Sequence, residues 1–585
     1  MKLSQKINKI FYTLFLAVFM FSCSVDESKE TLPKTQTSQS ISSIYYGGDI
    51  LTMVGDSPHY VEAVVESEGR IVFTGDKSKA LNFTKNTLNH VNLQGKTMLP
   101  GFIDGHGHVV NTGLQSLLAN LLPAPDGGAQ SHADIVDIMT AWSNDSNNQE
   151  VINSLGWIMG LGYDDGQLAE KAHPSAEVLD KISTEIPILL IHQSGHFGAM
   201  NSKAIELLGL TAASKDPQGG VYRRNPDGTP NGVLEENAFF NSFYPILGKM
   251  TQELKDKSFI AGQLSYASFG YTTAQDGRSM ADESATMARA SQANKLLIDV
   301  VSYPDIIVNR KSLTTQYNSA QYTNKYRIAG AKLTLDGSPQ GKTAWLSEPY
   351  HAPPFGQNAH YAGYGVITND EAAKYLSDAF ENNWQIITHA NGDKAIDQLV
   401  YAINIAAKQH GNEDRRPVLI HGQTLRADQI QSLVKLKIFP SLFPMHTFYW
   451  GDWHVESVLG HPRADFISPT KSVLEAGLKF TSHHDSPVTK PSSLRVLDAT
   501  VNRTTRSGVI LGPSERVSPY IALKALTDWA AYQHFEEKNK GTITVGKQAD
   551  FVILDKNPLK IEKVNLGKLK ILQTISYGET VYQSE

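Results

Sequence analysis

Two histidines that follow a short apolar run constrain the fold of this 585-residue chain more than any other feature. The run covers residues 98–103, ends in a turn signal, and is followed by His106 and His108. Side chains of an extended segment alternate between two faces, so residues two apart point in the same direction. Two imidazoles on one face at a strand end can bind one metal ion. Because such pairs often arise by chance, this pair indicates a metal site only if the fold places further metal ligands beside it.

The middle of the chain alternates apolar, strand-like runs with helical stretches, which is typical of βα units and a parallel sheet. Candidate strands end near residues 103, 191, 275, 302, 335, 388, 420, 442 and 482. That is one strand more than a (β/α)₈ barrel needs, and the strand at 186–191 falls in a long interval. We therefore predict an α/β fold with a (β/α)₈ TIM barrel over 98–535 and a large insertion around 114–249.

Both ends of the chain contain short strand-like runs. In residues 44–97 these runs are separated by Gly, Asp, Pro and Asn, and residues 541–585 repeat the pattern. Chain ends commonly lie close together in folded proteins. We therefore expect the segments 44–97 and 541–585 to form one small β-sandwich domain.

The first residues have the layout of a secretory signal. The apolar run at 10–21 is shorter than the about 20 residues that span a bilayer, and Cys23 follows it. We predict a lipoprotein-type signal peptide over 1–23 with a lipid on Cys23; a plain signal peptide and an uncleaved anchor are the alternatives. The protein is then exported, in the periplasm or at the outer membrane, with exposure at the cell surface as a further option. The positive head of the segment consists of Lys2, Lys6 and Lys9.

Composition narrows the classes of chemistry and partner. Cys23 is the only cysteine, which excludes an intramolecular disulfide, a thiolate metal cluster and a cysteine nucleophile. Residues 24–43 are rich in Ser, Thr, Lys and Glu and predict a flexible tether. With a formal net charge of -6, the chain lacks the excess of basic residues that is typical of a nucleic-acid-binding protein. We expect a small-molecule substrate, a membrane reached through the lipid, and no nucleic acid; a homo-oligomer stays open.

Four further polar residues stand at or near the ends of other predicted strands. His389 and His421 each close an apolar run, Asp485 follows a third, and Lys332 lies within a fourth. The strands of a parallel barrel share one end, where the chemistry of such folds is found, so these side chains converge if the barrel forms. Each has an ordinary alternative alone: a core histidine, a capping aspartate, a salt-bridged lysine.

Four sequence motifs carry a family resemblance. They are Pro-Gly-Phe-Ile-Asp-Gly-His-Gly-His at 100–108, Lys-Leu-Thr-Leu-Asp-Gly-Ser at 332–338, His-Ala-Asn-Gly-Asp at 389–393 and His-His-Asp-Ser-Pro-Val at 483–488. Together they resemble the amidohydrolase superfamily, specifically its amidohydrolase-3 (YtcJ-like) branch. The resemblance covers about 44–581 and implies a (β/α)₈ barrel with a β-sandwich built from both termini.

The same resemblance implies a site for one or two divalent metal ions, with Zn²⁺ the expected metal. The first two histidines would bind the more buried ion, the last two would bind the second, and a carboxylated lysine would bridge them. The aspartate would contact the first ion and transfer the proton as the catalytic residue. An ammonium group has only donors, so the lysine can bind a cation only as a neutral amine or a carbamate. The ligand set is His106, His108, Lys332, His389, His421 and Asp485.

These expectations describe a metal-dependent enzyme that hydrolyses a carbon–nitrogen bond other than a peptide bond. His196 and Tyr163 are the candidates for substrate binding. Two alternatives stay open: the same fold acting on an ester or lactone, and a regulatory or binding lipoprotein without turnover. A pure binder does not need Asp485, which favours the enzyme.

Overall fold

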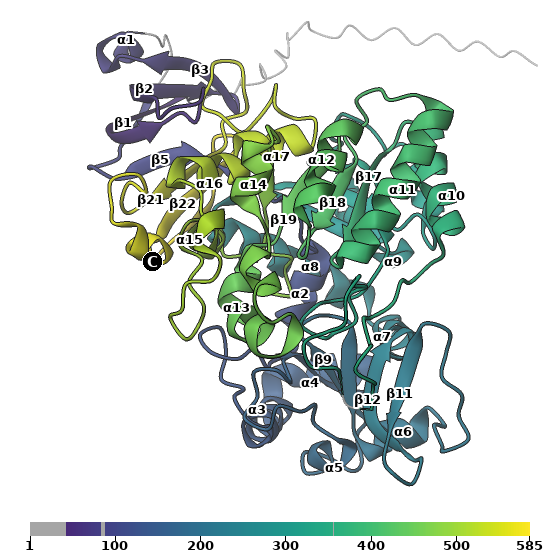
Figure 1. Ribbon diagram of the computed structural model, residues 1–585. Coiled ribbons are helices and arrows are strands. Elements are labelled where there is room, and N and C mark those ends of the chain that lie inside the picture. The colour runs from purple at the N-terminus through teal and green to yellow at the C-terminus, as the bar shows by residue number, and fades with distance from the viewer. Residues whose placement is uncertain (1–41, 83–87, 355) are drawn as a thin grey trace, which may run out of the picture. The chain divides into compact units, whose positions relative to one another are not determined.

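The centre of the structure is a set of parallel strands, with helices packed outside them (Figure 1). The computed structural model describes residues 42–82, 88–354 and 356–585, which belong to one compact unit. One parallel sheet consists of β6 (Phe102–Ile103), β13 (Tyr271–Ser279), β14 (Asp299–Pro304) and β15 (Tyr326–Ile328). The other consists of β16 (Gly330–Thr334), β17 (Gln385–Ala390), β18 (Val418–His421), β19 (Phe439–Leu442) and β20 (Thr481–Ser482).

Short contacts join these two sheets into a closed barrel. β15 and β16 are separated by Ala329 alone, and Asp305 pairs with Lys332 in a parallel bridge between β14 and β16. On the opposite seam the Asp485 N–H donates to the His106 carbonyl at 3.1 Å. If β15 and β16 are counted as one strand, the described residues form a barrel of eight parallel strands. The predicted TIM-barrel fold class is confirmed.

The helices that follow the strands bury one face against the barrel. α10 (Asn369–Glu381) begins with a capping box between Thr368 and Glu371. Its buried residues include Ala372, Leu376 and Phe380, which are spaced by four and therefore form one stripe. The other helices of this part are α8 (Gln252–Ser268), α9 (Ala281–Gln292), α11 (Asp393–His410), α12 (Ala427–Leu436), α13 (Met445–Trp453), α14 (Thr470–Glu475), α15 (Ser493–Asn502), α16 (Pro519–Leu526) and α17 (Asp528–Gln533).

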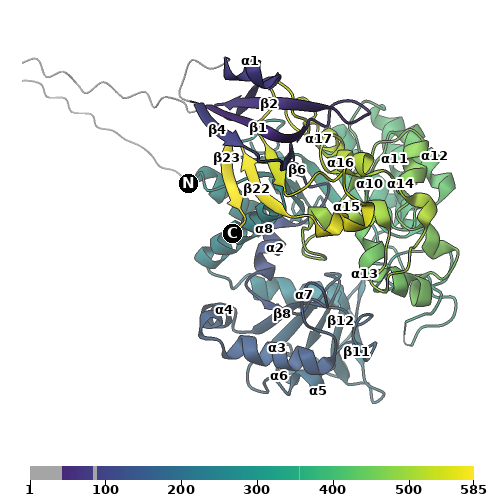
Figure 2. The ribbon, with the colours of Figure 1, turned by 90° about the vertical axis from the view of Figure 1, so that its left-hand side faces the viewer.

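Between β6 and β13 the chain forms a sheet of its own, in the strand order β11-β12-β10-β9-β8-β7. The strand expected at 186–191 is β9 of this sheet and not a barrel strand. Both ribbon views show these elements grouped at one end of the barrel (Figure 2). The strands are β7 (Ala119–Asn120), β8 (Ile158–Tyr163), β9 (Ile188–His192), β10 (Phe197–Met200), β11 (Gly220–Arg224) and β12 (Pro230–Glu236). The helices of this group are α3 (His132–Asn144), α4 (Gln149–Leu155), α5 (Ala176–Leu179), α6 (Ser202–Leu207) and α7 (Asn237–Leu247), whereas α2 (Val109–Gln115) packs against α8.

The two ends of the described chain share one sheet of eight strands, in which β5 and β21 are antiparallel neighbours. Leu99 pairs with Val552 and Met98 with Ile553 at this junction. The structure describes a single sheet, and a sandwich of two sheets stays a prediction, as do the domain boundaries. The strands are β1 (Ser42–Leu51), β2 (Tyr60–Ser67), β3 (Arg70–Gly75), β4 (Leu88–Asn92), β5 (Thr97–Pro100), β21 (Phe551–Leu554), β22 (Ile571–Ser576) and β23 (Glu579–Gln583), with α1 (Lys77–Leu81) beside them.

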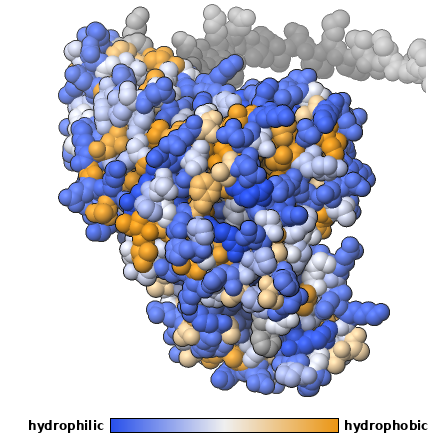
Figure 3. All heavy atoms as spheres, in the orientation of Figure 1, coloured by the Kyte–Doolittle hydropathy of each residue, from blue (hydrophilic) through white to orange (hydrophobic). Residues whose placement is uncertain are grey.

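The N-terminal predictions fall mostly outside the described residues. The signal peptide at 1–23, Cys23 and residues 24–41 of the predicted tether are not described. The tether ends earlier than predicted, because Ser42 and Ser43 are buried and belong to β1. Within the described ranges, no helix has the length and apolar character needed to cross a bilayer. On the face drawn in Figure 3, hydrophilic side chains predominate and apolar ones lie in small groups.

A buried ion cluster fastens the last part of the chain to the barrel. Lys540 Nζ lies 2.5 Å from Asp299 Oδ2 on β14 and 2.8 Å from Glu536 Oε2. Glu536 Oε1 lies 2.6 Å from Nη2 of Arg327 on β15. All four side chains are buried, so each charge depends on its partners. The cluster holds the segment that leads into β21 against β14 and β15.

Replacing Lys540 with Met should lower the free energy of unfolding by about 3–5 kcal/mol, because Asp299 and Glu536 lose a buried cation. Urea unfolding followed by circular dichroism measures the change. The matched control is Lys538→Met, which removes an exposed lysine two positions away and should cost less than about 0.5 kcal/mol. Equal losses in the two variants would contradict the role given to the cluster.

Candidate metal centre and active site

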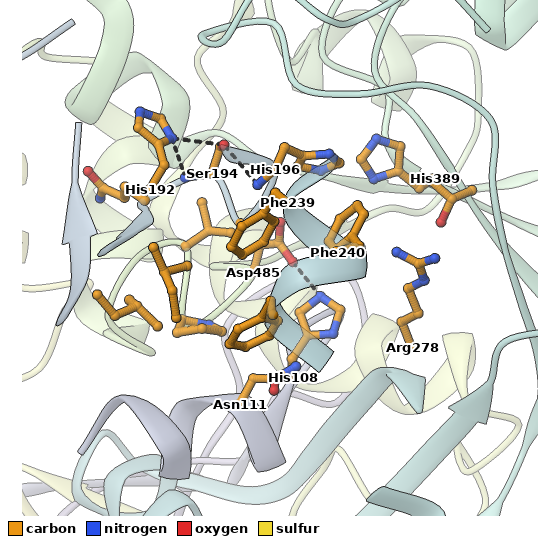
Figure 4. A pocket seen from close by; sticks show the side chains of 18 of the residues that line it. His108, Asn111, His192, Ser194, His196, Phe239, Phe240, Arg278, His389 and Asp485 are labelled. Atoms are coloured by element: carbon orange, nitrogen blue, oxygen red, sulfur yellow. Dashed lines mark hydrogen bonds and ion pairs between the residues drawn. The ribbon is translucent and has the colours of Figure 1, made fainter. Parts of the chain in front are cut away.

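All six predicted metal ligands line one cavity at the carboxyl ends of the barrel strands. The cavity has a volume of about 140 Å³, and Figure 4 shows His108, His389 and Asp485 around it. The chain thus brings together side chains that are far apart in sequence. They are His106 and His108 after β6, Lys332 on β16, His389 on β17, His421 at the end of β18, and Asp485 after β20.

Three of these residues offer atoms that converge most tightly. One ligand atom each from His106, His421 and Asp485 lies within 4.8 Å of the other two. The Asp485 carboxylate is 3.6 Å from His106 Nε2 and 3.8 Å from His421 Nε2. His108 joins them, since its Nε2 lies 3.1 Å from Asp485 Oδ1. These atoms surround a space that a single ion can reach.

Lys332 and His389 bring two more nitrogen atoms to the cluster. Lys332 Nζ lies 3.1 Å from His106 Nε2, and His389 Nδ1 lies 3.1 Å from His421 Nε2. Both pairs are buried, so nitrogen faces nitrogen where water has little access. Imidazole and carboxylate groups are the donors that Zn²⁺ accepts. The residues present therefore fit a divalent metal ion.

Burial sets the protonation of these nitrogen atoms. It lowers the pKa of His106 and of His421 well below the ordinary value, so both imidazoles are neutral. Burial also lowers the pKa of Lys332 to about 7, although Asp485 acts in the opposite direction. Neutral imidazole and neutral amine keep the lone pair that a metal ion, or carbon dioxide, requires.

Hydrogen bonds fix the orientation of two of the ligand rings. His106 Nδ1 donates to Gln275 Oε1 at 2.6 Å, which turns Nε2 toward the cavity. His421 Nδ1 lies 3.0 Å from His483 Nε2, and His483 Nδ1 lies 2.9 Å from Ser441 Oγ. Partners of this kind orient metal ligands and tune their basicity. Neither Gln275 nor His483 was predicted in this role; their only signal was a position near predicted strand ends.

The two predicted substrate-binding residues lie in different surroundings. His196 lines the cavity, and its Nδ1 is 2.8 Å from Glu236 Oε2 (Figure 4). Burial favours the neutral ring, but Glu236 outweighs it and raises the pKa of His196. Tyr163 is buried, its hydroxyl is 3.1 Å from His173 Nδ1, and it does not line the cavity. Tyr163 lies behind the cavity wall: its ring is 5.1 Å from that of His192 between centroids, and its carbonyl accepts the Gln193 N–H at 2.8 Å.

A second group, of two aspartates and a histidine, also has ligand atoms close enough together to hold a metal ion. Ligand atoms of Asp164, Asp165 and His192 lie within 4.8 Å of one another. Asp164 already accepts the Gly166 N–H at 2.9 Å and the Gln167 amide at 2.9 Å. Hydrogen bonds from the protein therefore already occupy the Asp164 carboxylate.

Aromatic residues of α7 form the apolar wall of the cavity. The sequence analysis did not identify this wall, although four aromatic residues within six positions were a visible signal. Arg278 from the end of β13 also lines the cavity. The aromatic residues are Phe239, Phe240, Phe243 and Tyr244.

Comparison with known proteins identifies the family. The chain matches the model of the Amidohydrolase family over residues 89–582, and it therefore belongs to that family. It is 26% identical to the candidate amidohydrolase YtcJ of Bacillus subtilis (strain 168), over 92% of this chain and 99% of that protein. It is 24% identical to the N-substituted formamide deformylase of Arthrobacter pascens, over 89% of this chain and 95% of that protein.

A solved structure supports the same class. An uncharacterized metal-dependent hydrolase from Pyrococcus furiosus superposes with a TM-score of 0.68 and 26% identity, over 89% of this chain and 100% of that one. The family and this neighbour support a metal-dependent hydrolase. The resemblance to the amidohydrolase-3 branch is confirmed.

Replacing His483 with Ala should weaken Zn²⁺ binding about 10- to 100-fold, because the His421 ring loses the neighbour that fixes its orientation. Competition with a chromophoric chelator measures the affinity. The matched control is His454→Ala, which removes another fully buried imidazole that does not line the cavity. An unchanged affinity in the His483 variant, or an equal loss in both, would exclude the orienting role.

Proposed function

We propose that this protein hydrolyses the carbon–nitrogen bond of a small amide, formamide or cyclic amide. The convergence of His106, His421 and Asp485 within 4.8 Å in a cavity of about 140 Å³ is the observation that carries the proposal. Membership of the amidohydrolase family supports hydrolysis, and the formamide deformylase among the relatives supports a carbon–nitrogen bond.

The six clustered residues would hold one or two divalent ions, with Zn²⁺ the best match to imidazole and carboxylate donors. When bound, such an ion makes water acidic enough to act as a nucleophile at neutral pH and polarises a carbonyl group. The protein supplies orientation around it: Gln275 and His483 hold two imidazole rings, and burial keeps them neutral.

Asp485 is the residue suited to move the proton. Its carboxylate faces the cavity beside His106, His108 and His421, and its backbone N–H is held by the His106 carbonyl. A carboxylate there can accept a proton from the attacking water and return it to the leaving nitrogen. His196, paired with Glu236 at 2.8 Å, is suited to donate a hydrogen bond to a substrate oxygen.

Lys332 is proposed to carry a carboxyl group on Nζ. Carbamate formation joins the amine nitrogen to the carbon of CO₂ and releases one proton, so it needs a neutral amine. The pKa of about 7 that burial produces makes that form available at neutral pH. The carbamate would present two oxygen atoms beside His106, whose Nε2 lies 3.1 Å from Nζ.

The location of the enzyme is a proposal from the sequence. We propose export, with a lipid on Cys23 that anchors the protein to a membrane of the cell envelope. The positive head, the short apolar run and the cysteine at 23 support it. The partners proposed with it are the membrane and a small-molecule substrate; assembly into a homo-oligomer stays an open option.

Replacing Asp485 with Asn should lower kcat about 10²- to 10⁴-fold, because the amide cannot accept the proton. Metal content should be retained, since five other candidate ligands remain. The measurement is product release from a panel of amides, N-acyl amino acids, esters and lactones, with metal analysis of the same samples. Asp452→Asn, at an exposed carboxylate bonded to Ser507, is the control.

Two results would contradict the proposal. One is an Asp485 variant that keeps its full rate on the substrate that the wild type prefers. The other is a wild-type protein that cleaves esters or lactones but no carbon–nitrogen bond.

Bicarbonate should increase the Zn²⁺ content of metal-stripped protein during reloading, because the carbamate of Lys332 completes the site. The content is measured by mass spectrometry after gel filtration, with CO₂-free buffer as the comparison. Lys332→Met should show no bicarbonate effect. Lys342→Met should retain it, because this buried lysine bonds to Ser457 and does not line the cavity. Equal loading of the wild type with and without bicarbonate would contradict the carbamate.

A further inference from the structure

Arg278 is a charged side chain in the cavity that the proposed hydrolysis does not use. It follows Gly277 near the carboxyl end of β13 and lines the same cavity as the candidate metal ligands. Its side chain is 27% exposed. Figure 4 shows the guanidinium directed toward the region between Phe240 and His389. Arg278 is therefore open to a molecule in the cavity.

The Asp305 carboxylate holds one of the three nitrogens of the Arg278 guanidinium. Arg278 Nε donates to Asp305 Oδ2 at 2.9 Å. The other Asp305 oxygen accepts the N–H groups of Ile307 and Val308 at 2.9 and 3.2 Å, so the carboxylate is held rigidly. Among the described residues, no hydrogen bond is formed by the two terminal nitrogens of Arg278. This pair of donors has the spacing of a carboxylate.

Arg278 keeps its positive charge in the cavity. Burial opposes the cation, but the neighbouring Asp305, Tyr244 and Glu283 together raise the pKa of Arg278. Because Arg278 and the candidate metal ligands line the same cavity, one small molecule can contact both.

One part of the remaining cavity wall is apolar. The guanidinium carbon lies 5.6 Å from the centre of the Phe240 ring, and three further aromatic residues of α7 line the same space. Leu114, Ile191 and Val488 add aliphatic surface. The cavity therefore combines the candidate metal ligands, an apolar wall and a guanidinium whose terminal nitrogens form no hydrogen bond with the described residues.

We infer that the substrate is a small organic anion whose carboxylate binds the terminal nitrogens of Arg278 while an apolar group packs on α7. This inference rests on the proposed function, because it sets the scissile carbon–nitrogen bond at the ligand cluster. N-acylated hydrophobic amino acids are the simplest class with these three features. Hydrolysis would add water across the acyl–nitrogen bond and release a carboxylic acid and an amino acid. Arg278 is then a specificity-determining residue.

The test compares two substrates that differ only in the carboxylate. N-acylphenylalanine carries it and N-acylphenethylamine lacks it, and each is made with formyl, acetyl and benzoyl groups. We expect the wild type to prefer the anion in kcat/KM by at least about 30-fold, the range of a charge-assisted hydrogen-bonded pair. Arg278→Gln should bring this ratio close to one, and Arg278→Lys should give an intermediate value. Released amine is measured for each substrate.

Two further variants keep the test decisive. Arg278→Gln leaves the buried carboxylate of Asp305 without its cation. The double variant Arg278→Gln/Asp305→Asn also removes this negative charge and should show the same loss of preference. Arg310→Gln removes an arginine that pairs with Asp378 at an exposed site and should keep the wild-type ratio. An equal ratio in the wild type and Arg278→Gln overturns the inference and leaves the proposed function intact.

A binding measurement separates the inference from the proposed function. Calorimetry with N-acetylphenylalanine should show binding to the wild type that weakens at least about 30-fold in Arg278→Gln. If no amide of either class is cleaved by metal-loaded protein, the proposed function fails, and calorimetry alone then decides whether Arg278 binds the anion. Equal affinity in both proteins overturns the inference.

Discussion

The site depends on the burial of nitrogen and oxygen ligand atoms that the barrel holds about one hydrogen-bond length apart. Burial keeps the imidazoles of His106 and His421 neutral and lowers the pKa of Lys332 to about 7. Neutral imidazole and amine nitrogens keep the lone pair that a cation accepts, and beside the Asp485 carboxylate they form a donor set that suits a divalent metal ion. Strand pairing in the barrel fixes the position of each ligand. Burial of the barrel's hydrophobic core provides the stability that keeps the ligands close together.

The candidate metal ligands and most of the residues proposed to bind substrate belong to different parts of the chain. The six candidate ligands belong to barrel strands or the residues directly after them, where backbone pairing leaves little freedom. His196, Glu236 and the aromatic wall belong to the segment between β6 and β13, which forms its own sheet. Changes in that segment can alter the substrate while the ligand cluster stays intact. Arg278 is the exception, since it belongs to barrel strand β13 and lines the same cavity.

The sequence predicted the strand ends well because an apolar run followed by a polar residue is a local pattern. His389, His421 and Asp485 were found in this way, and the parallel barrel then required them to meet. Gln275 and His483 could not be assigned, because their role depends on which neighbour a ring faces across two strands. For a similar reason, the sequence did not show that His196 lines the cavity and Tyr163 does not. Both residues lie between β6 and β13, and only the packing of that segment decides which one reaches the cavity. Ser42 and Ser43 were assigned to the tether because residues 24–43 are rich in Ser, Thr, Lys and Glu. Both serines are buried and pair with β4, and Ser43 also pairs with β2.

The most direct test of the central claim is anomalous diffraction at the zinc edge from crystals of the active, metal-loaded protein. The account predicts a peak bounded by His106, His421 and Asp485, with additional density on Lys332 Nζ. An active protein with no peak in the cavity, or with its only peak at Asp164, Asp165 and His192, would contradict it.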